Sequence, residues 1–215
     1  MPQSTAFSAH ACRAATNAIQ PAASGADRPA LVQLCRQIDD AFDAGGALVD
    51  PSQHAEFSTR LRVALAEVGA TSAWLTHSER VSNAQQYCRH LLAADPLGRY
   101  TVVSLVWRPG QWSPVHGHRT WCGYTVLDGT LTETLYDWNE AAGHATEVRC
   151  CRREVGAVSF VRAGATGIHR LGHDDDAAQS APAVSLPVYG VPVGQIATHV
   201  NDLVAYCRIA PAVNL

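Results

Sequence analysis

The chain has 215 residues, of which 47% are hydrophobic and 16% are charged, and its formal net charge is -3 at pH 7. This length and composition predict one domain with a sizeable core rather than a disordered chain. The sequence has no long basic run, no apolar stretch that could span a membrane and no secretory signal pattern, which argues against nucleic-acid binding, membrane insertion and secretion. We expect a cytoplasmic protein that acts on small molecules.

The N-terminal part of the chain carries helical patterns. Residues 1–27 are rich in small and polar residues, and we expect a flexible arm without chemistry there. One amphipathic helix is predicted between residue 27 and the glycine pair 45–46, because its apolar residues recur at spacings of three and four. A second helix is predicted from near Pro51, and a third over residues 83–92. Residues 28–95 are therefore expected to form a helical segment that packs on the remaining domain.

Residues 96–215 show a different pattern, in which short β-branched and aromatic segments alternate with turn signals. The candidate strands are residues 100–107, 123–127, 131–138, 146–150, 157–161, 184–189 and a run around 203–209. Asp128-Gly129 is a hairpin signal, so neighbouring strands are expected to be mostly antiparallel. The whole predicts a mainly β fold, a jelly-roll-like β-sandwich or small barrel, preceded by the helical segment.

A pair of histidines carries the clearest chemical signal. His116 and His118 are separated by one residue in a segment that should be extended, and residues two apart in a strand share a face. Two imidazoles on one side can bind the same cation, and a third ligand from a distant strand would complete a facial set with open positions. His169 is the best candidate for that third ligand.

The spacing around the pair is that of the cupin metal motif, with Gly110 six residues before the first histidine and Gly129 after the pair. Cys122 or Gly123 stands where this motif usually has a glutamate ligand. Three neutral imidazoles leave a divalent ion with its full charge and with vacant positions, so a thiol can bind it as the thiolate. Fe(II) suits this chemistry because it also activates dioxygen, which Zn(II) does not.

Longer segments around these motifs resemble the type I cysteine dioxygenases, including their bacterial members, over about residues 80–192. The resemblance rests on the segment from His116 to Trp138, on Gly167-Ile-His-Arg and on the strand that ends at Tyr189. It covers several motifs in the family's order. A cupin fold and a non-heme Fe(II) dioxygenase activity are what this resemblance implies.

The resemblance also implies individual roles. His116, His118 and His169 would hold the ferrous ion. Tyr189 would be the catalytic side chain, because its hydroxyl would lie beside the bound thiol and oxygen. Arg89 would bind the substrate carboxylate through paired hydrogen bonds. Related enzymes that act on 3-mercaptopropionate tend to carry glutamine at the position of Arg89, so arginine favours cysteine.

The chain departs from the family at two places. Gly123 stands where animal members have a cysteine crosslinked to the catalytic tyrosine, so we expect no thioether here. Cys122 is expected to point away from the site, because adjacent strand residues face opposite sides. Pro187 replaces a histidine that orients the tyrosine in many relatives, and Ser185 or His173 is expected to compensate.

The sequence thus predicts an oxidoreductase of cysteine catabolism that converts L-cysteine and O2 to cysteine sulfinate, with Fe(II) as cofactor. One alternative keeps the chemistry and changes the substrate to 3-mercaptopropionate or another small thiol. A further alternative is a non-catalytic, metal-binding cupin. The oligomeric state is left open, a monomer included.

Overall fold

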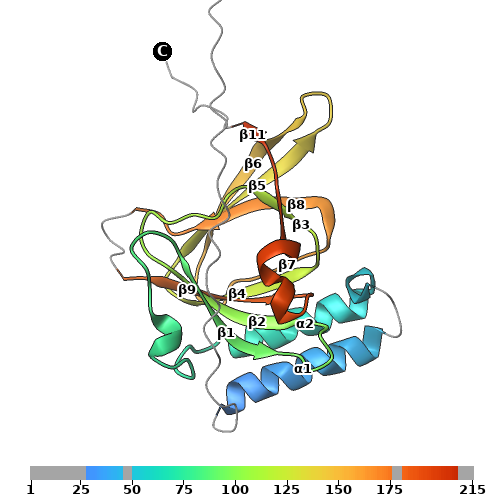
Figure 1. Ribbon diagram of the computed structural model, residues 1–215, viewed down its shortest axis with the longest axis vertical. Helices are drawn as coiled ribbons and strands as arrows, with labels where there is room; N and C mark the ends of the chain where they lie inside the picture. Colours follow the sequence, from blue (N-terminus) through green and yellow to red (C-terminus); the bar gives the residue numbers. More distant parts are fainter. Residues whose placement is uncertain (1–27, 46–49, 176–180, 208–215) are drawn as a thin grey trace, which may run out of the picture.

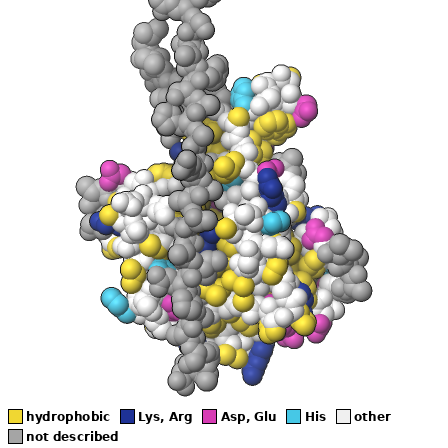
Figure 2. Space-filling view, in the orientation of Figure 1, with side chains coloured by type: hydrophobic (Ala, Val, Ile, Leu, Met, Phe, Trp, Pro, Cys, Tyr) yellow, Lys and Arg dark blue, Asp and Glu magenta, His cyan; other side chains and the backbone are white. Residues whose placement is uncertain are grey.

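The structure, a computed structural model, describes residues 28–45, 50–175 and 181–207. The predicted N-terminal arm, residues 1–27, lies outside these residues, as does the end of the strand run expected around 203–209. Among the described residues, no helix has both the length and the apolar character that a membrane span requires. The face shown in Figure 2 mixes hydrophobic, acidic and basic side chains, and the basic ones are spread over it singly.

Two β-sheets face each other and form the body of the molecule (Figure 1). The five-stranded sheet has the order β1 (Cys88–Ala94), β2 (Thr101–Trp107), β9 (Ala183–Tyr189), β4 (Cys122–Asp128) and β7 (Val158–Val161). The six-stranded sheet has the order β10 (Asn201–Leu203), β3 (His116–His118), β8 (Gly164–Gly172), β5 (Leu131–Asn139), β6 (His144–Arg153) and β11 (Tyr206–Cys207). All the described pairs are antiparallel except that of β11 with β6. The predicted mainly β, cupin-like sandwich is confirmed.

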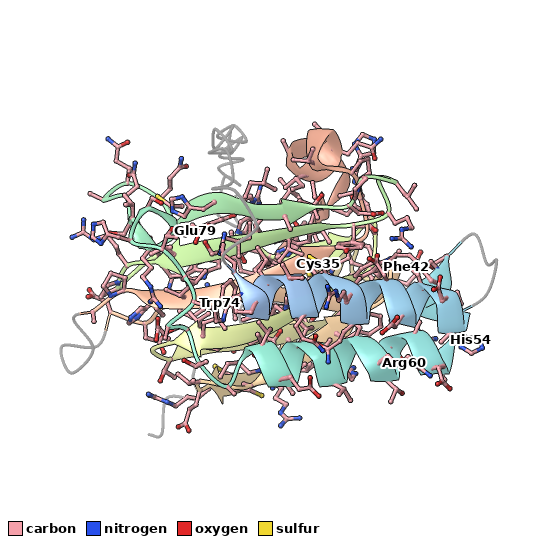
Figure 3. The ribbon with its side chains drawn as sticks, turned by 90° about the horizontal axis from the view of Figure 1, so that it is seen from below. Cys35, Phe42, His54, Arg60, Trp74 and Glu79 are labelled. Atoms are coloured by element: carbon pink, nitrogen blue, oxygen red, sulfur yellow. The ribbon has the colours of Figure 1, made fainter. Side chains whose placement is uncertain are left out.

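Two N-terminal helices cover the outer face of the five-stranded sheet, as Figures 1 and 3 show. They are α1 (Pro29–Gly45) and α2 (Ala55–Val68), with the 3-10 turn η2 (Pro51–Gln53) between them. Their buried residues recur at spacings of three and four: Leu31, Leu34, Ile38 and Ala41 in α1, and Phe57, Leu61, Ala64, Leu65 and Val68 in α2. This apolar stripe confirms the first two predicted helices. Short 3-10 turns η3 (Ser78–Arg80) and η4 (Val193–Gln195), and helix α3 (Ile196–His199), complete the helical elements of the described residues.

Strands β2 and β9 are buried on both faces, and alternate residues serve different layers. Val102, Leu186 and Val188 face the helices and join their core, whereas Val103 and Tyr189 belong to a second core between the two sheets. This alternation follows from the two-residue period of a strand. The outer face of the five-stranded sheet therefore packs against the helices, and its inner face, toward the other sheet, is the one that can contribute residues to a functional site.

The third predicted helix, over residues 83–92, is wrong. Strand β1 occupies this part of the chain and pairs with β2 from Cys88, opposite Val106, to Ala94, opposite Thr101. The register of β1 shifts between Leu91 and Ala93, so this segment lacks the regular two-residue alternation that would have indicated a strand. The N-terminal segment is consequently α-helical only as far as Val68.

The turn at Asp128-Gly129 does not close a hairpin. It connects β4 in one sheet to β5 in the other, so the chain crosses the sandwich at this point. Gly129 has a φ of +69°, and a Cβ there would lie 3.0 Å from the Cβ of Ala183. Local turn chemistry predicted the change of direction correctly but not the change of sheet. Strands β5 and β6 do form an antiparallel hairpin, which extends beyond the sandwich in Figure 1.

Candidate metal centre

The three histidines predicted as ligands lie together on the six-stranded sheet. His116 and His118 are the ends of β3, and His169, in β8, is the direct partner of His116 across the two strands. Residues two apart in a strand share a face, as do direct cross-strand partners. The three ring centroids are accordingly 4.8, 4.9 and 5.0 Å apart, and one nitrogen from each ring lies within 4.8 Å of the others.

Burial favours the neutral form of His116 and His118. The exposed fractions are 7% for His116, 3% for His118 and 5% for His169. Loss of hydration, and then the neighbouring imidazole of His169, lower the pKa of His116 to about 3 and that of His118 to about 2. A neutral imidazole is the form that coordinates a metal, because its second nitrogen keeps a lone pair.

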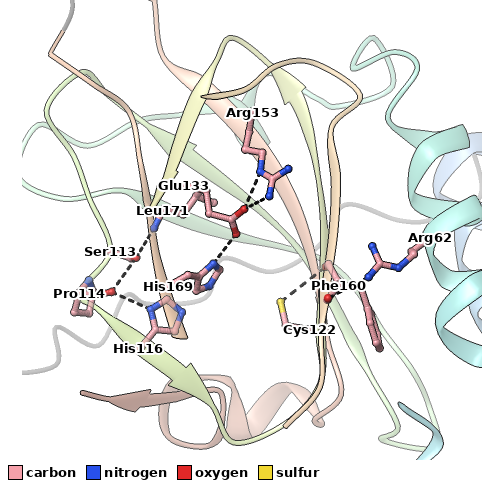
Figure 4. A network of polar contacts seen from close by, with 11 residues as sticks. Arg62, Ser113, Pro114, His116, Cys122, Glu133, Arg153, Phe160, His169 and Leu171 are labelled. Atoms are coloured by element: carbon pink, nitrogen blue, oxygen red, sulfur yellow. Dashed lines mark hydrogen bonds and ion pairs between the residues drawn. The ribbon is translucent and has the colours of Figure 1, made fainter. Parts of the chain in front are cut away.

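Hydrogen bonds orient two of the rings, as Figure 4 shows. Nδ1 of His116 lies 2.9 Å from the carbonyl oxygen of Pro114, to which it donates. Nδ1 of His169 donates to Oε1 of Glu133 at 2.7 Å. With Nδ1 protonated in both rings, Nε2 carries the lone pair. The donor set and its orientation therefore fit one metal ion bound by three histidines.

A cavity between the two sheets begins at these histidines. The other side chains that line it include Tyr87, Arg89, Leu105, Trp107, Ser113, Cys122, Tyr124, Leu171, Ser185, Pro187, Tyr189 and Asn201. These residues come from both sheets, so the cavity depends on the whole sandwich rather than on one loop. Its mixture of apolar walls and a few polar groups is typical of small-molecule sites.

Arg89 and Tyr189 meet inside this cavity. The guanidinium carbon of Arg89 lies 6.0 Å from the ring centroid of Tyr189. Within the described residues, the Nε atom of Arg89 is buried and has no hydrogen-bond partner. Burial, followed by the nearby thiol of Cys122, raises the pKa of Tyr189 well above its usual value, so this phenol stays protonated at neutral pH. Arg89 reaches the site from strand β1, not from the predicted helix.

The expectation that Cys122 points away from the site is wrong. Cys122 is the direct partner of Tyr189 in the pairing of β4 with β9, and both side chains line the cavity. A Cβ added to Gly123 would instead lie 2.8 Å from Cδ1 of Leu65, on the side of helix α2. Packing of the helix against Gly123 thus turns Cys122 inward. The expectation that no thioether forms rests on Gly123 and stays a prediction, although the Cys122 side chain now lines the same cavity as Tyr189. The intact mass of the purified protein tests this expectation.

Neither expected substitute for the relay histidine orients Tyr189 through a hydrogen bond among the described residues. Oγ of Ser185 accepts a hydrogen bond from Nε1 of Trp107 at 3.0 Å. The ring nitrogens of His173 lie 2.9 and 3.0 Å from the backbone carbonyls of Asp174 and Ala181. The polar side chain that reaches the phenol is Arg89, which also lowers the pKa of Tyr189 against the larger effect of burial.

Three residues of the site were not singled out from the sequence. Tyr87 stacks on Trp107 with ring centroids 4.3 Å apart, Tyr124 lines the cavity from β4, and Glu133 contacts His169. Tyr87 precedes Arg89 by two residues, so a strand assignment for this segment would have placed both side chains on one face. Glu133 has a weaker signal, because it is one of two acids in the segment that forms β5.

The two facing sheets define a β-sandwich of the cupin class, and the three convergent histidines form a group that can hold a metal ion. The family model of cysteine dioxygenase type I matches residues 23–201. The chain belongs to the cysteine dioxygenase type I family.

Curated relatives agree with this assignment at low identity. The rat protein "Cysteine dioxygenase type 1" is 30% identical over 110 residues, which are 50% of this chain and 52% of the rat protein. The zebrafish protein of the same name is 28% identical over 111 residues, with 50% of this chain and 52% of that protein covered. The match therefore spans about half the length of these relatives.

Solved structures with similar folds include two bacterial proteins. A protein with a double-stranded β-helix domain from Klebsiella pneumoniae has a TM-score of 0.41 at 16% identity, and the match covers 58% of this chain and 88% of that one. A cupin superfamily protein from Desulfitobacterium hafniense has a TM-score of 0.38 at 14% identity, with 52% of this chain and 83% of that one covered.

Proposed function

We propose that this protein is an iron-dependent thiol dioxygenase that converts L-cysteine and O2 to cysteine sulfinate. The observation that carries the proposal is the combination, in one cavity, of three convergent histidines with the half-buried Arg89, whose enclosed Nε has no partner among the described residues. The histidines leave a cation with vacant positions, and the guanidinium provides a fixed positive charge beside them. A small thiol that also carries a carboxylate matches both features.

The histidines would hold the metal through Nε2. His116 and His169 have their Nδ1 atoms engaged by Pro114 and Glu133, which prevents the rings from rotating. Fe(II), when bound there, supplies the redox chemistry that activates dioxygen and favours the thiolate form of the substrate. In the overall reaction both oxygen atoms of O2 end on sulfur, and the thiol proton is released.

Arg89 would fix the other end of the substrate. A carboxylate can accept two parallel hydrogen bonds from a guanidinium, which sets its direction as well as its distance. Arg89 is held from one side by the Tyr189 ring. The carboxylate of cysteine would thus be anchored while its sulfur and amine face the histidines. Substrates without an amine, such as 3-mercaptopropionate, would lose the contact that the amine makes on the side of the histidines.

Tyr189 would act as a hydrogen-bond donor to the reacting groups. Its phenol is kept protonated by burial, and its hydroxyl lies in the same cavity as the histidines. The apolar side chains of Leu105 and Leu171 line other parts of the wall and limit the access of water. A protonated donor in a site with little water stabilises developing negative charge more than it would in solution.

Oxygen consumption by anaerobically iron-loaded protein tests this function. L-Cysteine and 3-mercaptopropionate are supplied separately, products are identified by mass spectrometry, and iron-free protein is the control. Rapid, iron-dependent uptake with formation of cysteine sulfinate supports the proposal. A higher rate with 3-mercaptopropionate would change the assigned substrate but not the type of reaction. No oxygen uptake with either thiol would instead support a non-catalytic, metal-binding cupin.

Arg89→Gln tests the role assigned to the guanidinium. We expect kcat/KM for L-cysteine to fall by about 10- to 100-fold, because a hydrogen-bonded charged pair contributes about 1.5–3 kcal/mol. The ratio of rates for cysteine and 3-mercaptopropionate should shift toward the latter. Arg60→Gln is the matched control, because Arg60 is half exposed on α2. An unchanged substrate ratio in the Arg89 variant would contradict this role.

The corresponding cellular role is cysteine catabolism in the cytoplasm, with small-molecule thiols and O2 as partners and without nucleic acid or membrane. Fractionation of cells that produce the chain tests the location. The concentration of free cysteine sulfinate in these cells tests the role, and we expect it to rise when the chain is produced.

A further inference from the structure

Glu133, in strand β5, carries a carboxylate that is almost completely enclosed, with 1% of the residue exposed. Its Oε1 accepts a hydrogen bond from Nδ1 of His169 at 2.7 Å. Its Oε2 accepts from Nε of Arg153 at 2.7 Å, and also from Nη2 of the same guanidinium. Figure 4 shows the three side chains in a row from Arg153 through Glu133 to His169. A charge buried this deeply is tolerated only where such partners replace its hydration.

The register of the six-stranded sheet explains the row. Leu135 lies directly opposite His169 in β8, and Leu131 lies directly opposite Arg153 in β6. Glu133 stands between these two leucines on the same face of β5, so it is the diagonal neighbour of both partners. Three adjacent strands therefore fix the positions of the three groups.

The three histidines differ in what lies behind them. Nδ1 of His116 donates to the neutral carbonyl of Pro114, whereas Nδ1 of His118 is buried and has no hydrogen-bond partner among the described residues. Within the described part of the chain, a carboxylate contacts the His169 ring alone. The metal set is thus chemically asymmetric, although its three ligands are the same type of residue.

We infer that Glu133 is a positioning residue for the metal centre and that Arg153 holds its carboxylate in place. The inference rests on the proposed function, because it requires the histidines to bind a metal. The carboxylate fixes the Nδ1–H tautomer of His169, directs Nε2 toward the ion and makes this imidazole a stronger donor than a carbonyl-bonded one. The usual glutamate ligand of the cupin motif is missing, but the Glu133 carboxylate lies behind the ligand His169. It supplies negative charge there and leaves the coordination positions of the ion open.

Metal binding without substrate tests the inference. Apparent affinities for Co(II) and for Fe(II) are measured anaerobically by competition with a chelator for wild type, Glu133→Gln, Glu133→Ala and Arg153→Met. We expect both Glu133 variants to bind about 10- to 100-fold more weakly, as is typical for loss of such a partner. Arg153→Met should weaken binding by a smaller factor, because Glu133 keeps its contact with His169. The visible spectrum of bound Co(II) should change in Glu133→Gln, which preserves the size of the side chain but not its charge.

Glu79→Gln is the matched control. Glu79 is also buried and paired with an arginine, Arg28, but its partners do not include a histidine of the site. This variant should retain the affinity and the Co(II) spectrum of wild type. Equal losses in the Glu79 and Glu133 variants would show a general effect on folding and would overturn the inference.

A second measurement needs no metal at all. Nitrogen-15 NMR of the histidine rings in metal-free protein should show a single Nδ1–H tautomer for His169 in wild type and a mixture in Glu133→Ala. The role of Glu133 would be refuted if Glu133→Gln and Glu133→Ala kept the metal affinity, the Co(II) spectrum and the His169 tautomer of wild type. Wild-type protein that binds Co(II) but oxidises no thiol would refute only the proposed function, because these measurements use no substrate.

Discussion

Two buried glutamates, each paired with an arginine, lie on opposite sides of the five-stranded sheet and have different roles. Glu79, 5% exposed, accepts two hydrogen bonds from Arg28 at 2.7 and 3.0 Å. Glu133, 1% exposed, accepts two from Arg153. The pairs differ in their third partner, which is the backbone N–H of Thr76 for Glu79 and an imidazole of the metal centre for Glu133.

The third partner decides what each pair does. Arg28 immediately precedes α1, and it also lies over the ring of Trp74, with 5.5 Å between its guanidinium carbon and the ring centroid. Figure 3 shows Glu79 and Trp74 near this end of the helix. This pair therefore fastens the helical layer to the sheet. The other pair has the same chemistry, yet its contact with His169 connects it to the site.

Removal of a proposed ligand is expected to have the largest effect, and it should separate the two regions. His169→Ala should reduce thiol oxidation to the level of iron-free protein, because a third imidazole completes the facial set. Iron stoichiometry after anaerobic loading, measured together with oxygen uptake, checks this outcome. The helix content by circular dichroism should match wild type, since α1 and α2 lie on the far side of the five-stranded sheet. Full iron binding by this variant would exclude His169 as a ligand.

Glu79→Ala should affect the opposite region. It leaves the Arg28 guanidinium buried without its partner, which typically costs about 3–5 kcal/mol of folding free energy. Urea unfolding of the metal-free protein measures the loss. Glu56→Ala is the control, because Glu56 forms an exposed pair with Arg60 on α2, and such helical pairs contribute only about 0.3–0.5 kcal/mol. Similar losses in the two variants would contradict the structural role of Glu79.

A third acid–arginine pair, between Arg99 and Asp95, should show the smallest effect. Burial alone would raise the pKa of Asp95, but hydrogen bonds from Arg99 and from the backbone outweigh it and hold the pKa below its usual value of 3.8. A folded-state pKa below the unfolded one means that this contribution is present above about pH 4 and is lost as the pH falls further. Solvent screening around Arg99 limits it to about 1 kcal/mol or less.

Comparison of acid unfolding in wild type and Asp95→Asn measures this contribution. The difference in free energy of unfolding between the two proteins should shrink as the pH falls from 5 toward 3, an interval of about two units around the usual carboxylate range. A difference that stays constant over this interval would show that Asp95 acts through packing rather than charge.

Much of the fold could be predicted from local patterns, and the errors arose where the deciding contacts are distant. The stripe of Leu34, Ile38 and their neighbours needed no tertiary information to indicate a helix. The segment around Arg89 has residues compatible with either structure, and its pairing with β2 made it a strand. The Asp128-Gly129 turn likewise contains no information about which sheet receives the next strand.

The candidate site shows the same division. His116 and His118 are two residues apart, so their shared face could be predicted, and His169 was identified by its motif. The inward direction of Cys122 could not be predicted, because it depends on Leu65 of α2 filling the space behind Gly123. Glu133 becomes meaningful only when the register of β5 with β8 places it beside His169.

Strand β3, which carries two of the histidines, is bordered by β8 on one side and by β10 on the other, where Leu203 pairs with His116 and Asn201 with His118. A ribosome makes β3 more than 80 residues before β10, as the numbering of these strands gives. A nascent chain therefore cannot complete the ladder around the two histidines until β10 has left the exit tunnel. We expect the two histidines of β3 to reach their final positions only after β10 has been synthesised and has paired with β3.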